Sequence, residues 1–197
     1  MAAPITARLA GDLHVVSVDY RLAPEHPFPA ALHDALAVYR ALVEAGPVVV
    51  AGDSAGGGLA VALALALAVG QPGTTLPAPA GLVLLCPFLD HGAEPGGRFS
   101  HAYLGDRSPT DPLASPARAA PADLARLPPM LLQTGTADAL FAQSVAFARR
   151  ARAAGAPVTL DVWHGLWHTW HYHRELPESH RALAEVAAYV RSVVSPA

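Results

Sequence analysis

The sequence predicts an α/β protein with a mostly parallel β-sheet flanked by helices. Five short apolar segments are mostly continuous runs of valine and leucine, which is typical of strands covered on both faces. Segments with helical periodicity lie between or after these runs, and such alternation indicates βαβ units. The 197 residues contain neither an internal repeat nor a linker, so we expect residues 1–197 to form one domain.

The expected elements follow one another along the whole chain. The predicted strands are His14–Tyr20, Pro47–Gly52, Gly81–Pro87, Pro129–Gly135 and Pro157–Trp163. The predicted helices are Ala31–Ala45, Ala60–Val69, Leu140–Ala154 and Ala182–Val194. Between the third and fourth strands, Phe88–Leu127 shows no periodicity and is rich in Gly, Pro and Asp. A loop of this length is usually functional, or it carries short irregular helices.

Composition excludes several classes of protein. Hydrophobic residues make up 52% and charged residues 15% of the chain, which excludes an intrinsically disordered protein. The 13 basic residues are all Arg and the net charge is −3, so we expect no nucleic-acid partner. The most apolar run, Leu59 to Val69, is too short to span a bilayer. With one cysteine, Cys86, and no signal-peptide pattern, we expect a cytoplasmic protein.

The segment Gly52-Asp53-Ser54-Ala55-Gly56 joins an apolar strand to an apolar helix. This is the G-x-S-x-G pattern at a strand-to-helix turn, which presents a serine hydroxyl at the carboxyl edge of a sheet. We expect a Cβ atom at Gly52 or Gly56 to collide where strand and helix approach. The helix N-terminus would aim free N–H groups at a developing oxyanion. Ser54 is therefore a candidate nucleophile, and the alternative is a glycine-rich turn with an incidental serine.

A nucleophilic serine needs a base, and the base needs a carboxylate to orient it. In folds with this type of turn, the three catalytic residues follow one another along the chain in the order serine, acid, histidine. Asp138 follows a predicted strand and is the preferred acid, while Asp90 after one strand and Asp161 within another are the alternatives. Four histidines follow the last strand, and these residues alone do not decide between them: His164, His168, His171 and His173. The four-residue spacing of His164 and His168 also suggests a metal site as an alternative. No nearby Cys or acid in the sequence completes the ligand set of such a site.

Five segments carry longer motifs in a fixed order. They are V-D-Y-R-L-A-P-E (Val18–Glu25) followed by H-P-F-P-A-A, G-D-S-A-G-G (Gly52–Gly57), D-P-L-A-S-P (Asp111–Pro116), L-P-P-M-L-L-Q-T-G-T-A-D-A-L (Leu127–Leu140) and W-H-G-L-W-H-T-W (Trp163–Trp170). In these motifs the chain resembles the hormone-sensitive-lipase-like branch of the α/β-hydrolase carboxylesterases. The first two segments are specific to that branch.

The resemblance implies an α/β-hydrolase fold and a serine carboxylesterase that acts on short to medium acyl esters through an acyl-enzyme. Carried over residue by residue, Ser54 is the nucleophile, Asp138 the acid and His168 the base, in a G-x-x-H-x-aromatic pattern. The N–H of Ala55 is the assignable oxyanion donor. The resemblance implies a small ester as the substrate, with neither a cofactor nor a metal ion.

The sequence departs from the family before Tyr20, where members carry an H-G-G-G-type motif that supplies the other half of the oxyanion hole. We therefore expect residues 1–197 to be a partial α/β-hydrolase domain without the N-terminal strands and cap. The strands at His14–Tyr20 and Pro47–Gly52 would then pair directly or leave open edges, favouring self-association. Loss of a donor lowers the rate by roughly 10²–10³. The alternatives are a silent fragment serving as a binding or interaction module, and an amidase or peptidase.

Overall fold

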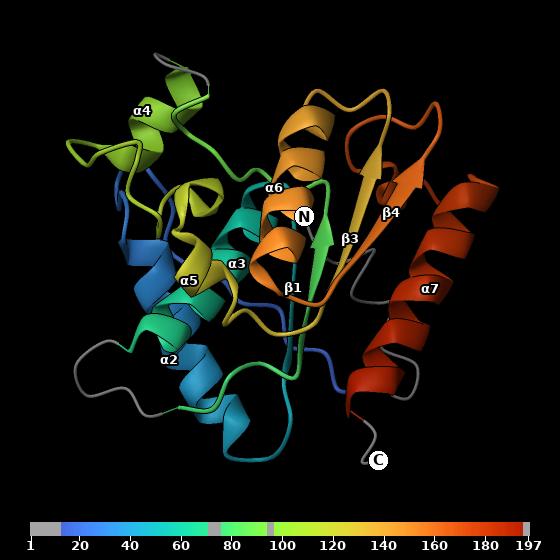
Figure 1. The fold of residues 1–197 in the computed structure, drawn as a ribbon, viewed down its shortest axis with the longest axis horizontal. Helices are drawn as coiled ribbons and strands as arrows, with labels where there is room; N and C mark the ends of the chain where they lie inside the picture. Colours follow the sequence, from blue (N-terminus) through green and yellow to red (C-terminus); the bar gives the residue numbers. More distant parts are fainter. Residues whose placement is uncertain (1–12, 71–75, 94–96, 195–197) are drawn as a thin grey trace.

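A parallel sheet of four strands forms the centre of the computed structural model, which describes residues 13–70, 76–93 and 97–194 (Figure 1). The strands are β1 (Val49–Asp53), β2 (Gly81–Leu85), β3 (Met130–Gly135) and β4 (Val158–Trp163). They lie in the order β1-β2-β3-β4, and every neighbouring pair is parallel. The predicted parallel sheet is confirmed, and all four carboxyl ends lie at one edge.

Helices cover both faces of this sheet, as predicted. They are α2 (Ala30–Val43), α3 (Ala55–Val69), α4 (Arg98–Leu104), α5 (Pro121–Leu124), α6 (Phe141–Ala154) and α7 (Pro177–Val194), with 3₁₀ turns η1 (Pro116–Arg118) and η2 (Trp170–Tyr172). In Figure 1, α7 lies on the opposite side of the sheet from α3 and α6. The aperiodic segment 88–127 carries α4, η1 and α5, so it holds short irregular helices.

The side chains of β2 show how the sheet holds the two layers together. Leu82 and Leu84 pack with α3 and α6, while Val83 and Leu85 pack with α7. All four side chains are at most 3% exposed. Because both faces of this strand are buried, its sequence is a continuous apolar run rather than an alternation.

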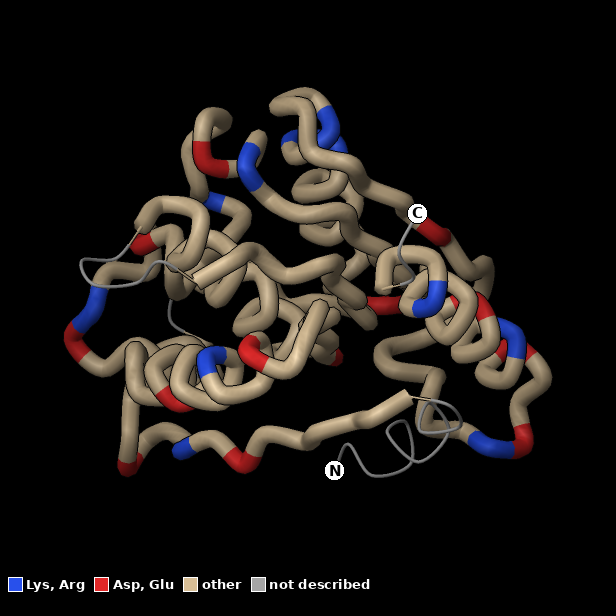
Figure 2. Tube along the Cα trace, turned by 90° about the horizontal axis from the view of Figure 1, so that it is seen from below, with Lys and Arg blue, Asp and Glu red and all other residues tan. Residues whose placement is uncertain are grey.

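The predicted strand at His14–Tyr20 is wrong. This segment is extended, but it pairs with no other strand of the described chain, and β1 forms the edge of the sheet. Figure 2 shows it as a separate run along one side of the molecule. Arg21, the residue directly after this segment, connects it to α2. The backbone N–H and the guanidinium of Arg21 both donate to the Asp34 carboxylate, at 2.9 and 2.8 Å. Among the described residues, the side of β1 that faces away from β2 pairs with no strand, and the self-association expected from the sequence at such an edge stays a prediction.

The charged residues are distributed along the whole trace (Figure 2). In Figure 2 the arginines are scattered among acidic residues along the trace rather than gathered into a stripe. In the described parts of the chain, no helix has the length and apolarity needed to cross a membrane.

Candidate active site

Ser54 sits at the sharp turn between β1 and α3, in a backbone conformation that is rare outside glycine. Its φ is +51° and its ψ is −120°. The Ser54 N–H donates to the Leu85 carbonyl at 2.9 Å, and the Ser54 carbonyl accepts from the Phe88 N–H at 2.8 Å. Both partners belong to β2 or the loop after it. The strained turn is therefore held by backbone hydrogen bonds to the neighbouring strand, independently of the serine hydroxyl.

The glycines near Ser54 that have no room for a Cβ atom are only partly those expected from the sequence. A Cβ atom at Gly52 would overlap the Gly56 carbonyl oxygen, so the expected collision is confirmed there. A Cβ atom at Gly56 would meet nothing within 4 Å, so the same expectation for Gly56 is wrong. The close contacts lie one and two residues later, where Gly57 and Gly58 face the loop after β2 and a Cβ on Gly57 would lie 2.7 Å from Pro87.

This difference predicts opposite effects for two alanine substitutions in one motif. Gly52→Ala should lower the free energy of unfolding by about 1–3 kcal/mol, because strand and helix must move apart to admit the methyl group. Gly56→Ala has open space and lies in the first turn of α3, so it should be neutral or stabilising by up to about 1 kcal/mol. Chemical denaturation of both variants measures the difference. Equal losses of stability would contradict the assigned contacts.

Three side chains from three strand ends form one chain of hydrogen bonds. Ser54 Oγ lies 2.9 Å from His168 Nε2, and His168 Nδ1 lies 3.0 Å from Asp138 Oδ1. A carboxylate only accepts, so Nδ1 carries the proton and donates, which leaves Nε2 free to accept from the serine hydroxyl. The Asp138 side chain is fully buried, while that of His168 is 39% exposed. The imidazole therefore bridges a buried charge and an accessible hydroxyl.

The surroundings of Asp138 keep its carboxyl group ionised. Burial alone raises the pKa of this group, but the hydrogen bonds from His168 and from the Leu140 N–H, together with the nearby Cys86 thiol, outweigh it. The net result is a pKa below the ordinary value of an aspartic acid. The Leu140 N–H donates to Oδ1 at 2.9 Å, which is the same oxygen that accepts from His168. Both bonds orient the carboxylate towards the imidazole.

The other two carboxylates considered from the sequence have different partners. Asp90 Oδ1 accepts from Arg118 Nε at 3.0 Å and from the Gly92 N–H at 2.9 Å. Asp161, within β4, accepts at Oδ2 from the Trp163 indole N–H at 2.6 Å and from Gln133 at 3.0 Å. The structure brings neither of them to His168.

The neighbouring histidines also lie in different surroundings. His171 is 1% exposed, and its Nε2 lies 3.1 Å from Gln133 Oε1, to which it donates. Burial, and then the nearby His168, lower the pKa of His171 to about 3, so its ring is neutral at ordinary pH. His173 is exposed, stacks edge-on against Trp167 and lies 3.3 Å from Glu175. His164 is exposed.

The acid loop after β3 and the histidine loop after β4 are joined by backbone contacts. The Thr136 N–H donates to the Trp163 carbonyl at the end of β4, and the Ala137 N–H donates to the Leu166 carbonyl in the histidine loop, each at 3.0 Å. A Cβ atom at Gly135 would overlap the Leu166 carbonyl, so glycine permits this close approach. The two loops therefore hold Asp138 and His168 at a fixed separation.

Two further residues beside these side chains were missed by the sequence reasoning. The Tyr172 hydroxyl donates to Asp53 Oδ2 at 2.9 Å, which ties the histidine loop to the residue just before Ser54. Cys86 Sγ, a carboxylate oxygen of Asp138 and a ring nitrogen of His168 lie within 4.8 Å of one another. In the described part of the chain, this is the only His, Cys or carboxylate cluster with metal-ligand spacing. His164, considered from the sequence as a ligand, is not in it.

Ala55 is an exposed residue, and its N–H group is the first of α3. It has no hydrogen-bond partner among the residues that the structure describes. It lies next to Ser54 at a helix N-terminus, where the helix dipole favours negative charge.

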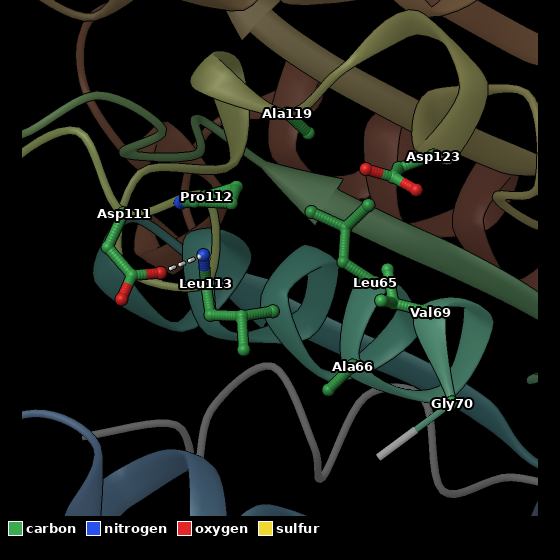
Figure 3. Close-up of a pocket in the computed structure, with 9 residues that line it drawn as sticks. All are labelled: Leu65, Ala66, Val69, Gly70, Asp111, Pro112, Leu113, Ala119 and Asp123. Atoms are coloured by element: carbon green, nitrogen blue, oxygen red, sulfur yellow. Dashed lines mark hydrogen bonds between the residues drawn. The ribbon is translucent and has the colours of Figure 1, made fainter.

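A pocket of about 400 Å³ lies away from these residues, at the C-terminal end of α3 (Figure 3). Leu65, Val69 and Leu113 form apolar walls, and Asp111 and Asp123 contribute carboxylates. None of the three hydrogen-bonded side chains lines it. This pocket is therefore separate from the candidate active site.

Comparison with known proteins identifies the family. A family model described as the alpha/beta hydrolase fold matches residues 3–172. The crystal structure of a hormone-sensitive lipase from a metagenome library superposes with a TM-score of 0.86 at 35% identity, over 98% of this chain and 71% of that one. This chain belongs to the hormone-sensitive-lipase branch of the α/β hydrolases. The predicted fold and family are thereby confirmed.

Two bacterial relatives also match along most of the chain. An acetyl-hydrolase of Streptomyces hygroscopicus is 40% identical over 200 residues, covering 90% of this chain and 64% of that protein. An esterase of Acinetobacter venetianus is 34% identical over 206 residues, covering 92% of this chain and 65% of that protein. The chain spans just under two thirds of the length of these relatives.

Proposed function

We propose that this α/β hydrolase is a serine carboxylesterase that cleaves small esters with short to medium acyl groups. The observation that carries the proposal is the hydrogen-bonded chain from Ser54 Oγ through His168 to Asp138, at 2.9 and 3.0 Å. A hydroxyl aligned with a neutral ring nitrogen, itself oriented by a buried carboxylate, is the arrangement that activates a serine. The relatives named esterase and acetyl-hydrolase support an ester as the substrate and a small acyl group.

The first half of the proposed reaction acylates the serine. Ser54 Oγ forms a bond to the ester carbonyl carbon while His168 Nε2 takes the hydroxyl proton. The Asp138 carboxylate stabilises the imidazolium that results. Negative charge develops on the carbonyl oxygen, and the Ala55 N–H donates to it. When this intermediate collapses, the bond to the alcohol oxygen breaks, and His168 returns the proton to the leaving alcohol.

The second half releases the acid. A water molecule gives a proton to His168 Nε2 and attacks the acyl carbon, and the bond to Ser54 Oγ then breaks with return of that proton. Proton transfer by a positioned histidine contributes about 10²–10⁴ to the rate. Each oxyanion donor contributes about 2.7–4 kcal/mol of transition-state stabilisation. With Ala55 as the one assigned donor, we expect measurable but modest turnover from the 197-residue chain.

Hydrolysis of p-nitrophenyl acetate, butyrate and octanoate tests the proposal. We expect turnover of the two shorter esters, preceded by a burst of about one p-nitrophenolate per chain as the acyl-enzyme accumulates. Mass spectrometry of the quenched burst should find the acyl group on the peptide that contains Ser54. p-Nitroacetanilide is the control for amidase chemistry and should not be cleaved. Absence of both turnover and acylation would favour a silent binding module instead.

A further inference from the structure

Cys86 occupies a central but unassigned position beside the proposed triad. It directly follows β2, its side chain is fully buried, and its φ of +49° lies in the left-handed region that favours glycine. The Cys86 N–H donates to the Gln133 carbonyl at 2.8 Å, which holds this strained residue to β3. A non-glycine residue in such a conformation costs about 1–2 kcal/mol, so glycine would suit the backbone better. Cysteine differs from glycine at this position by its thiol group, so the thiol is the feature that needs an explanation.

The surroundings of the thiol come from two of the loops that carry triad residues. The Thr169 N–H, next to His168, donates to Cys86 Sγ at 3.4 Å. On the other side lies the Asp138 carboxylate, within 4.8 Å of the sulfur. Asp138 Oδ1 accepts from His168 and Leu140, whereas Oδ2 is buried and has no hydrogen-bond partner in the described chain. The remaining donor beside this carboxylate is the S–H group.

We propose that Cys86 is a positioning residue for the triad, whose thiol donates to the Asp138 carboxylate while its sulfur accepts from the Thr169 N–H. The thiol then links the acid loop to the histidine loop through one atom. It fixes the plane of the carboxylate, so that Oδ1 faces His168 Nδ1. An N–H bound to the sulfur also polarises the S–H group, which strengthens an otherwise weak donor. This inference rests on the proposed esterase function.

The protonation state of Cys86 supports donation. Burial first, and the adjacent Asp138 carboxylate as well, raise the pKa of the Cys86 thiol far above its ordinary value. The sulfur therefore keeps its proton throughout the working range of an esterase. A protonated and fully buried thiol is neither a nucleophile nor a good metal ligand. Both ring nitrogens of His168 are also occupied by hydrogen bonds, to Asp138 and to Ser54, so neither is free to bind a metal ion. The function left for the Cys86 thiol is a hydrogen bond to the Asp138 carboxylate.

A pair of substitutions separates a donor from a space-filling side chain. Cys86→Ser and Cys86→Ala have nearly the same volume, but only serine can donate. We expect kcat for p-nitrophenyl butyrate to fall about three- to tenfold in Cys86→Ala and less than twofold in Cys86→Ser, with KM unchanged. Cys86→Gly, which suits the positive φ, is a second donor-free variant and should behave like Cys86→Ala. It keeps the test decisive if the alanine variant does not fold.

A second readout does not need catalysis. Without the S–H donor, more negative charge stays on the Asp138 carboxylate, which stabilises protonated His168. NMR titration of the His168 ring should therefore give a pKa higher by about half a pH unit in Cys86→Ala and Cys86→Gly, but not in Cys86→Ser. A residue that only fills space would change the melting temperature without moving this pKa.

The outcomes distinguish this inference from the proposed function. If the chain hydrolyses no ester but the His168 pKa moves as stated, the positioning role stands and the esterase proposal fails. If esters are hydrolysed and the serine and donor-free variants are equally active with one His168 pKa, the positioning role is overturned.

Discussion

Ser54→Ala is expected to abolish both ester hydrolysis and labelling of the chain by a fluorophosphonate probe. Loss of a nucleophilic serine lowers kcat by at least about 10⁴-fold, because the acyl-enzyme can no longer form. The variant should fold, since the turn is held by backbone hydrogen bonds from Ser54 to Leu85 and Phe88 rather than by its hydroxyl. Activity on p-nitrophenyl butyrate and the mass of the intact labelled chain measure the two effects.

A second serine provides the matched control. Ser108 is exposed and its hydroxyl lies 2.8 Å from Thr110 Oγ1, in the segment that follows α4. Ser108→Ala should keep full activity and full labelling. Fluorophosphonate labelling that persists in Ser54→Ala, or that disappears in Ser108→Ala, would show that the nucleophile has been assigned to the wrong residue.

The strands could be predicted from sequence where burial decides the pattern. The runs at β2 and β3 are continuous because helices cover both faces, and their apolar composition alone identifies them. His14–Tyr20 contains three valines among polar residues, but it is not a strand because no backbone of the described chain pairs with it. Strand formation is a property of two segments, and the sequence of one segment does not contain its partner.

The same distinction separates the site residues that could be predicted from those that could not. Ser54 lies in a local motif, and the expected positions of Asp138 and His168 came from chain order and family resemblance. The proposed role of Cys86 and the contact of Tyr172 with Asp53 depend on residues 83 and 119 positions away in the chain. No local pattern encodes such pairs. The contacts of Gly57 and Gly58 likewise depend on which face of α3 meets the loop after β2.

His168→Ala is expected to be as damaging as loss of the serine, at least about 10⁴-fold in kcat, because in the described part of the chain His168 Nε2 is the base within hydrogen-bond distance of Ser54 Oγ. His164→Ala and His173→Ala remove exposed rings and should leave activity within about twofold, as surface changes usually do. His171→Ala should keep most of the activity of the folded enzyme. It should lower the free energy of unfolding by about 1–3 kcal/mol, because Gln133 Oε1 loses a buried donor.

Parallel measurements of kcat and of urea unfolding separate these effects. The four variants differ in what the lost ring contacts: Ser54 and Asp138 for His168, and Gln133 for His171. The rings of His164 and His173 are exposed, and that of His173 contacts Trp167 and Glu175 at the surface. His168→Ala should therefore unfold at nearly the urea concentration of the parent protein while having lost its activity, and His171→Ala should show the reverse. If His168→Ala retains activity and one of the other three loses it without loss of stability, that histidine is the base. The hydrogen bond from His168 to Ser54 would then have no role in proton transfer.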